Sequence, residues 1–446
     1  MHVRRRTGWI TAIAAAMGVA LAVGPAASAL VAAAPLGSAA AVDRSSGDRL
    51  SVEYFPDPAG PGVHLQVPAT KAPGSRAAKV TAEVRALART GPADARMDVV
   101  ITGDGYTAHQ QDDFLADART KWAEILQKEP YASYAGLFNV WTVEAVSDES
   151  GVSGDPTADV IRDTALGTYF WCVDTERLLC ADIDKVAAFA ALAPEADLVL
   201  VLANSTKYGG AGYAGLEAAG YPFEGVSTLS SDHALSSLIA VHEIGHSVGL
   251  LADEYSYDGY GTYVGEEAPE PNVSTRNAYE QLAARTKWWR WMGATDPSGG
   301  TVGTYEGARY YPFGIYRPTS DSLMQTLEAR AFNLPSQEAL IDGFYRYGDL
   351  LTSRVPSGST IGRWQRVTVR LADVSGLAEA QLRWYVDGRE IRRLRGQTSV
   401  KPAWLGISAY RQHTLRASAS DHTDAIRDPR IRAETRTTLH WTVRKG

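Results

Sequence analysis

The chain has 446 residues, of which 45% are hydrophobic and 21% charged, with 41 Gly, 21 Pro and two Cys. These proportions are ordinary for globular proteins and exclude collagen-like, coiled-coil, disordered and disulfide-scaffold classes. At roughly 100 to 200 residues per domain, the chain is long enough for a catalytic domain and an accessory domain.

Charge is unevenly distributed along the chain, although the formal net charge is only −7. From residue 362 onward, 17 Lys and Arg against 8 Asp and Glu give a net charge of +9, whereas residues 30–361 carry −19. Either the acidic and basic parts dock onto each other, or the basic region holds an anionic cell-surface polymer. We favour docking and keep the polymer as a candidate partner. No nucleic-acid partner is expected.

The first 29 residues are typical of a secretory signal peptide. Three arginines end at Arg6, an apolar run covers 8–23, and Ala27-Ser28-Ala29 fits the small-x-small cleavage rule. The chain is therefore predicted to be secreted into the extracellular space. No later stretch reaches the roughly 18 apolar residues of a membrane span.

Residues 43–95 mix Pro, Gly and charge without a clear period, so we expect residues 30–95 to form an extended N-terminal segment or a removable prosegment. The next residues, 97–101, are apolar and predict a short strand. Thr107 and Gln110 can form a capping box, after which Phe114, Ala118 and Trp122 recur at helical spacing. A strand followed by an amphipathic helix is half of a βαβ unit.

Further strands and helices alternate down to about residue 248. Strands are predicted at 138–146 and 198–202, a helix at 181–192, and a second helix from about 232 to 248 that Ser231 can cap. This alternation indicates a mixed α/β domain, which we assign to residues 96–351.

The pattern changes after this domain. Residues 352–361 contain a Ser, Pro and Gly linker, and short alternating strands follow at 367–371, 381–386, 413–419 and 437–443. Asp387-Gly388 is a strong hairpin signal. Residues 362–446 are therefore predicted to form an immunoglobulin-like β-sandwich without an internal disulfide.

The second helix contains the sequence His242-Glu243-Ile244-Gly245-His246. On a helix, two residues four apart lie on one face about 6 Å apart along the axis, so both imidazoles can reach one Zn²⁺ ion. Glu243 can lean over the open coordination position and act as general base toward a zinc-activated water. This combination of residues suits hydrolysis of a peptide bond.

A catalytic zinc site needs a third protein ligand. Gly249 would let the helix stop and the chain bend back beneath the metal. The residue six positions after His246 is Ala252, which cannot bind zinc, so we choose Asp253 as the ligand and keep Glu254 as the alternative. The residue that does not bind zinc would hydrogen-bond a ligand histidine or cap the loop.

The segment 242–255 resembles the signature of the IgA peptidase family of secreted zinc metallopeptidases, a metzincin-like group. Other blocks similar to the family occur in the same order, at 101–107, 138–140, 147–153, 204 with 208–212, and 317–318 followed by Met324. The resemblance covers about residues 97–345. It implies a metzincin-like zinc-peptidase fold, in which Met324 takes the place of the methionine that forms an apolar floor beneath the metal. Thr326 stands where some metzincins have an oxyanion-stabilising Tyr, which leaves Tyr255 and Tyr316 as weak candidates for that role.

Two further features complete the site predictions. Residues 210–215 match G-x-G-x-x-G, but no strand leads directly into them and no long helix follows, so a dinucleotide site is disfavoured. We expect Tyr208, Gly209 and Gly210 to shape a substrate rim instead. Cys172 and Cys180 are predicted to form a disulfide that closes a small loop, as is usual in exported proteins.

Together these patterns predict a secreted metalloendopeptidase with one Zn²⁺ ion and a protein or peptide substrate. Two alternatives remain open. One is a catalytically idle zincin that binds a cell-surface polymer, and the other is a zinc amidase that acts on cell-wall peptides.

Overall fold

The protein is described here from a computed structural model that covers residues 49–68, 80–217, 219–329 and 331–445. The predicted signal peptide lies outside the described residues, as do residues 30–48 of the predicted N-terminal segment. Among the described residues, no helix combines the length and the apolar character that crossing a membrane requires.

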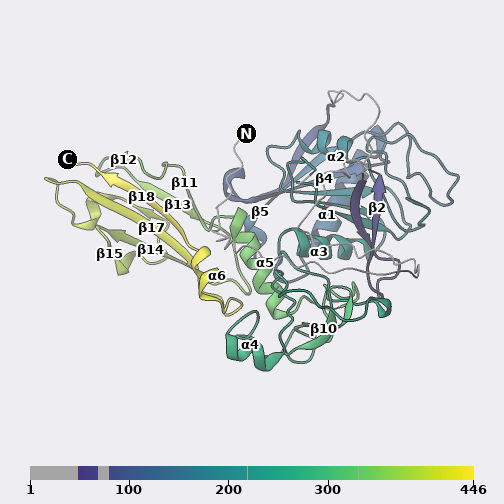
Figure 1. Ribbon diagram of the computed structural model, residues 1–446. Coiled ribbons are helices and arrows are strands. Elements are labelled where there is room, and N and C mark those ends of the chain that lie inside the picture. Colours follow the sequence, from purple (N-terminus) through teal and green to yellow (C-terminus); the bar gives the residue numbers. More distant parts are fainter. Residues whose placement is uncertain (1–48, 69–79, 218, 330, 446) are drawn as a thin grey trace, which may run out of the picture. The chain divides into compact units, whose positions relative to one another are not determined.

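An eight-stranded mixed sheet is the main element of the larger region (Figure 1). The spatial order of its strands is β2-β1-β7-β8-β6-β4-β5-β3. The centre is parallel, because β4 pairs in parallel with β5 and β6, and β6 pairs in parallel with β8. The outer strands β7, β1, β2 and β3 are antiparallel to their neighbours. The strands are β1 (Arg49–Tyr54), β2 (Val63–Pro68), β3 (Glu83–Arg89), β4 (Met97–Asp104), β5 (Phe138–Glu144), β6 (Leu198–Ala203), β7 (Gly210–Ala214) and β8 (Gly225–Ser230).

Helices cover both faces of this sheet. On one face α1 (Gln111–Ile125), α3 (Ser236–Ser247) and α5 (Leu334–Tyr347) share a core with Val99, Ile101 and Leu200. On the other face α2 (Ile183–Ala190) packs with Val100 and other residues of the same strands. Successive residues of a strand point to opposite faces, so the apolar runs in β4 and β6 serve both cores.

Most of the predicted elements of the α/β region are confirmed. The strands at 97–101, 138–146 and 198–202 correspond to β4, β5 and β6, and the capping box of Thr107 and Gln110 precedes α1. The start of the second predicted helix is wrong, because α3 begins at Ser236 and no side chain caps it. The Ser231 hydroxyl instead hydrogen-bonds Asp232, and its backbone N–H donates to the Ala203 carbonyl at the end of β6.

The N-terminal segment contributes three strands to the sheet, which its irregular sequence did not predict. Strands β1 and β2 form an antiparallel hairpin at one edge, and β3 pairs with β5 at the other. These strands are only partly buried, so their hydrophobic pattern is weak. They obtain their conformation from pairing rather than from local propensity.

Between α3 and α5 the chain forms loops around a small two-stranded sheet. This part contains α4 (Ala278–Ala284), β9 (Tyr305–Ala308) and β10 (Tyr311–Arg317). The loop before β9 also buries Trp288 and Trp291 with Val302 in a separate apolar cluster.

The C-terminal region consists mainly of strands arranged in two sheets. One has the order β11-β13-β16 and the other β12-β18-β17-β14-β15. Trp384 and Trp441 are fully buried with Leu415, Ala417 and Val369. The predicted strands and the Asp387-Gly388 hairpin between β14 and β15 are confirmed. The elements are β11 (Leu351–Ser353), β12 (Thr360–Ile361), β13 (Val367–Leu371), β14 (Ala380–Val386), β15 (Arg389–Glu390), β16 (Ser399–Val400), β17 (His413–Asp421), α6 (Pro429–Glu434) and β18 (Thr437–Val443). Thus β11 and β12 take up part of the predicted linker.

Candidate active site

Helix α3 presents two histidines toward one point. The Nε2 atoms of His242 and His246 lie 2.9 Å apart. Each ring is oriented through its other nitrogen, because Nδ1 of His242 donates to the Leu323 carbonyl at 2.7 Å and Nδ1 of His246 donates to the Leu251 carbonyl at 2.8 Å. Such hydrogen bonds fix the tautomer and leave Nε2 free to bind a metal.

Asp253 reaches the same point from the chain that follows the helix. Its Oδ1 lies 3.2 Å from Nε2 of both histidines. The reversal of the chain is made by Leu250, which has a φ of 52°, and not by Gly249 as predicted. Gly249 is instead required for packing, because a Cβ there would lie 2.7 Å from the Gly245 carbonyl oxygen.

Glu254 points away from the two histidines. Its buried carboxylate accepts hydrogen bonds from Asn272, Ser322 and Asn333, and its backbone N–H donates to the Met324 carbonyl. The Glu254 side chain therefore ties the loop of Asp253 to the segment around Met324. Of the two acidic residues considered as the third ligand, the structure brings only Asp253 to the histidines.

Glu53 from β1 completes a group of four potential metal ligands with His242, His246 and Asp253. Its carboxylate oxygens lie 3.5 Å from Nε2 of His242 and 3.3 Å from Nε2 of His246. Sequence reasoning missed this residue, because it lies 189 positions before His242 in a segment without a recognisable motif. Only the pairing of β1 with β7 brings it to the site.

These four side chains fit a zinc ion by donor type and by spacing. Two nitrogen and two oxygen donors at about 2.0 to 2.2 Å from a tetrahedral centre would stand roughly 3.3 to 3.6 Å from one another. Most of the distances above fall within or close to this range. The two carboxylates are also almost fully buried, with exposures of 3% for Glu53 and 2% for Asp253. Two carboxylates buried this close to each other are stable as anions only with positive charge beside them, which a bound metal ion would supply.

The pKa values of the two carboxylates agree with this charge state. Burial and the charge of Asp253 would raise the pKa of Glu53, but His64 and His242 outweigh them and lower it to about 2. Burial likewise opposes ionisation of Asp253, yet His246 and the hydrogen bonds from both α3 histidines hold its pKa well below its usual range. Without a metal, these anions are balanced by protonated histidines, and a metal ion at the same point would take the place of the Nε2 protons and stabilise the same two anions.

Glu243 lies beside this group without belonging to it. Burial, reinforced by the charge of Glu53, raises the pKa of the Glu243 carboxyl to about 8. Its Oε1 is buried and has no hydrogen-bond partner among the described residues. Gly212 of β7 faces this carboxyl so closely that an added Cβ would lie 1.8 Å from it. A buried carboxyl with a raised pKa and a free oxygen is suited to proton transfer.

Two tyrosines and a further histidine surround the acidic ligands. The Tyr255 hydroxyl donates to Glu53 Oε1 at 2.7 Å, and the Tyr310 hydroxyl donates to Asp253 Oδ2 at 2.8 Å. Nε2 of His64 lies 3.3 Å from the same Asp253 oxygen. Tyr310 and His64 were not predicted. Of the two tyrosines considered for the oxyanion, Tyr255 lies at the site, whereas Tyr316 pairs through its backbone with Ser274.

The remaining predicted residues take the following places. Met324 is fully buried and packs against Gly245, the residue that directly precedes His246 on α3. A Cβ at Gly245 would lie 2.7 Å from the Met324 sulfur. Tyr208, Gly209 and Gly210 lead into β7 and are largely buried, but the glycine that faces Glu243 is Gly212. Cys172 and Cys180 form a disulfide in the structure.

A helix that carries two histidines and a glutamate, with Asp253 folded back toward them, forms a group of side chains that could hold a metal ion. A family model described as IgA Peptidase M64 matches residues 85–298 and 294–344, more than half of the chain. The chain therefore belongs to this peptidase family, as its sequence resemblance predicted. His242, Glu243, His246 and Asp253 lie within the match, whereas Glu53 and the C-terminal strands lie outside it. No curated protein matches the chain.

Proposed function

We propose that the protein is a secreted endopeptidase that depends on a single zinc ion. The observation that carries this proposal is the meeting of His242, His246 and Asp253 beside the buried carboxyl of Glu243. Membership of a peptidase family supports peptide hydrolysis as the reaction. The ligand types, two histidines and carboxylate, favour zinc over calcium or magnesium, which prefer oxygen ligands.

His242, His246 and Asp253 would hold the zinc, and a bound zinc ion would supply Lewis-acid polarisation of the scissile carbonyl and of an attacking water. Glu243 would take the proton of that water on its free Oε1 and pass it to the departing amine. Its burial and its unpartnered Oε1 suit both steps. Tyr310 would hold Asp253 through its Oδ2 and so keep Oδ1 turned toward the histidines.

The arrangement of the larger region supports a metzincin-like fold for residues 96–351. The helix with both histidines packs against a mixed sheet in which β7 is antiparallel to β8. Met324 lies against Gly245, next to His246 on the same helix. We further propose that residues 362–446 form an immunoglobulin-like sandwich. The signal-like sequence of the first 29 residues and the single disulfide support secretion.

Peptide hydrolysis tests the proposal. Zinc-loaded full-length protein and its Glu53→Ala variant are assayed on casein and on a random peptide library, each with and without Glu243→Gln. We expect hydrolysis by at least one of the forms that retain Glu243, and a rate lower by about 10² to 10⁴ in the matching form that lacks it. If the zinc-loaded wild type and the zinc-loaded Glu53→Ala variant are both inactive, the result favours the idle zincin. Cleavage restricted to very short cell-wall peptides would favour the amidase.

A further inference from the structure

Strand β1 lies across the site in the position that an extended peptide would occupy. It pairs antiparallel with β7 through Ser51 with Ala214, Val52 with Tyr213 and Glu53 with Gly212. Addition of a strand to an exposed sheet edge is a common way of binding extended peptides. Because Gly212 faces Glu243, the residue of β1 that passes closest to the proposed general base is Glu53.

Glu53 also fills the place that a catalytic zinc site must leave open. Such a site has three protein ligands and keeps its fourth position for water or substrate. Here the fourth position faces the Glu53 carboxylate, which Tyr255 further fixes by a hydrogen bond. A Cβ at Gly62, on the other side of the hairpin, would lie 2.1 Å from Glu53 Oε1, so this glycine is needed to let the carboxylate enter.

The chain that follows Glu53 is attached to the peptidase part by specific contacts. The ring of Phe55 packs edge-on against His242 at 4.8 Å between centroids. Arg177 donates to the Pro56 carbonyl, and the backbone N–H of Leu327 donates to the Pro58 carbonyl. These contacts lie outside the β1–β2 pairing, so the segment is held at the site itself and not only at the sheet edge.

We propose that the hairpin of β1 and β2 is an autoinhibitory segment, in which Glu53 occupies the fourth zinc position and β1 occupies the peptide-binding edge of β7. The inference rests on the proposed zinc peptidase function. It is supported by the family match, which begins at residue 85 and so leaves the hairpin outside the shared peptidase region. Release of the hairpin would free the metal and the β7 edge together.

Cobalt substitution tests this proposal without measuring hydrolysis. The full chain, Glu53→Ala and the matched control Ser51→Ala are loaded with Co²⁺, and azide is added while the visible absorption bands are recorded. We expect azide to change the spectrum of Glu53→Ala and to leave those of the wild type and Ser51→Ala unchanged. An equal response of the wild type and Glu53→Ala would overturn the proposal. Absence of stoichiometric cobalt binding in all three would refute the metal site and with it the proposed function.

Hydrolysis provides a second, separable comparison. In the zinc-loaded proteins, Glu53→Ala should raise kcat/KM for a short peptide by at least about tenfold, because a larger fraction of molecules has an open site. Ser51→Ala should match the wild type. Equal rates in the wild type and Glu53→Ala would contradict inhibition by Glu53 while leaving the peptidase function intact.

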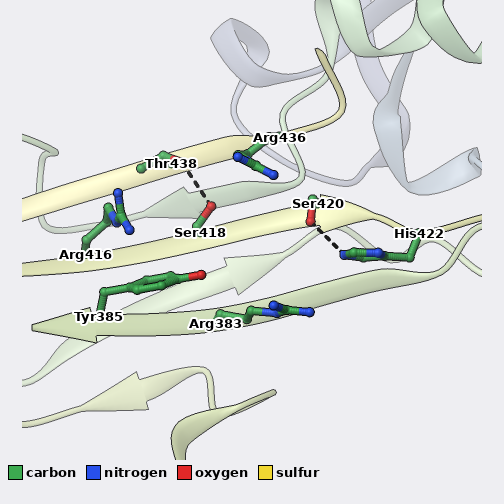
Figure 2. A pocket seen from close by; sticks show the side chains of 8 residues that line it. All are labelled: Arg383, Tyr385, Arg416, Ser418, Ser420, His422, Arg436 and Thr438. Atoms are coloured by element: carbon green, nitrogen blue, oxygen red, sulfur yellow. Dashed lines mark hydrogen bonds between the residues drawn. The ribbon is translucent and has the colours of Figure 1, made fainter. Parts of the chain in front are cut away.

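A second proposal, independent of the metal site, concerns a groove on the sheet formed by β14, β17 and β18 (Figure 2). Its volume is about 230 Å³, and none of the eight described residues that line it is acidic. Arg383, Arg416, Arg436 and His422 line it together with the hydroxyls of Ser418 and Thr438. The cations lie on the face opposite to the buried Trp384 and Trp441.

The arginines are spaced along the strand direction. Arg416 pairs with Tyr385, Arg383 pairs with Ser418 in the next row, and Arg436 lies at the row of Ser420 (Figure 2). Successive rows are about 6.7 Å apart along the strands. The three arginines also lie on different strands, because Arg416 is on β17, Arg383 is on β14 and Arg436 directly precedes β18. The guanidinium of Arg416 lies 4.2 Å from the centroid of the Tyr385 ring, and its Nε is buried with no partner among the described residues.

We propose that this groove binds the phosphate groups of a linear polymer. Guanidinium groups match phosphate oxygens in planar pairs of hydrogen bonds. The hydroxyls of Ser418 and Thr438 hydrogen-bond each other, which leaves one of them free to donate to a ligand. The groove is too small for a compact drug-sized ligand, whereas three cations on three successive rows match a repeating anion. The net charge of +9 beyond residue 361 acts in the same direction.

Binding of linear polyphosphate to the full chain tests this second proposal. The double variant Arg416→Gln/Arg436→Gln should weaken binding at least about tenfold, and Arg436→Gln alone should weaken it less. The control Arg389→Gln/Arg392→Gln removes the same charge outside the groove and should change the affinity less than about twofold. Equal weakening by both double variants would show general charge attraction and overturn the site. Poly-glutamate binding as tight as polyphosphate binding would overturn the assignment to phosphate.

Discussion

Gly212 and Glu243 approach each other so closely that a methyl group on the glycine would lie 1.8 Å from the carboxyl carbon of the glutamate. The glycine belongs to β7, which lies between β1 and β8 and would become the edge strand if the β1–β2 hairpin were released, and the glutamate belongs to helix α3, which packs against β7. The pair explains why a strand with the composition Gly-Ala-Gly borders the site. In the proposed mechanism, β7 must come near enough for a substrate paired with it to meet both Glu243 and the proposed metal ligands.

Gly212→Ala should therefore reduce peptidase activity without unfolding the protein. The added methyl group must displace the Glu243 carboxyl, which a proton-transfer group tolerates poorly, and we expect a loss of at least about 10²-fold in kcat. The assay uses the Glu53→Ala background so that the site is open. Gly259→Ala is the control, because a Cβ there has no neighbour within 4 Å. Unchanged kcat in Gly212→Ala would mean that the position of Glu243 does not matter.

Zinc affinity should distinguish Asp253 from Glu254. Asp253→Ala removes a ligand oxygen, so the protein should lose zinc to a chelator at ordinary concentrations. Glu254→Ala leaves all four potential ligands but cuts the ties to Asn272, Ser322 and Asn333, and we expect a weakening of roughly 10- to 100-fold. Competition with a chromophoric chelator measures both affinities. Tight zinc binding by Asp253→Ala together with zinc loss in Glu254→Ala would reverse the ligand assignment.

Asp197 should make the fold less stable as the pH rises. Burial, together with the charges of Asp98, Glu195 and Glu224, raises the pKa of Asp197 to about 7. Since this carboxyl has a pKa near 3.9 in the unfolded chain, the native state binds more protons between about pH 4 and 7, and stability falls with pH over that window. The contribution is fully present below about pH 4 and lost above about pH 7.

Urea unfolding at pH 5 and pH 8 checks this expectation. Asp197→Asn should remove about 1 to 3 kcal/mol of the stability difference between the two pH values. Asp113→Asn, a change at an exposed position of α1, should leave the difference as in the wild type. An identical pH dependence in wild type and Asp197→Asn would show that Asp197 is not protonated in the folded protein.

Asp421 should be important for the stability of the fold. Its Oδ2 accepts hydrogen bonds from the buried hydroxyls of Tyr134 and Tyr345, and its Oδ1 accepts from the Glu379 backbone. Asp421→Ala leaves both hydroxyls without their partner, at an expected cost of about 2 to 5 kcal/mol. Denaturant unfolding measures this loss, and a change below about 0.5 kcal/mol would contradict it. Removal of the C-terminal strands should destabilise α5 for the same reason.

The parts of the fold that could be predicted are those that local sequence determines. The apolar runs of β4 and β6, the capping box before α1 and the Asp387-Gly388 turn each depend on residues close in sequence. The two histidines of α3 were identified for the same reason, because helical geometry alone places residues four apart on one face.

The parts that were missed depend on pairing between distant segments. Glu53 reaches the metal ligands only because β1 adds to β7, and no residue near Glu53 in sequence indicates that pairing. Tyr310 binds Asp253 from a loop 57 positions away, and the Leu250 turn adopts a positive φ that a leucine rarely takes. Such features follow from tertiary packing and leave little trace in local hydrophobic pattern or turn composition.

Zinc titration into chelator-treated Glu53→Ala protein tests the central claim most directly. Peptide hydrolysis is followed as zinc is added, in parallel with the double variant Glu53→Ala/Glu243→Gln. We predict that activity returns to its maximum at one zinc per chain. The double variant should bind the same single zinc with activity lower by about 10² to 10⁴. Full activity of the zinc-free protein, or equal hydrolysis by the two zinc-loaded proteins, would contradict a zinc peptidase that uses Glu243.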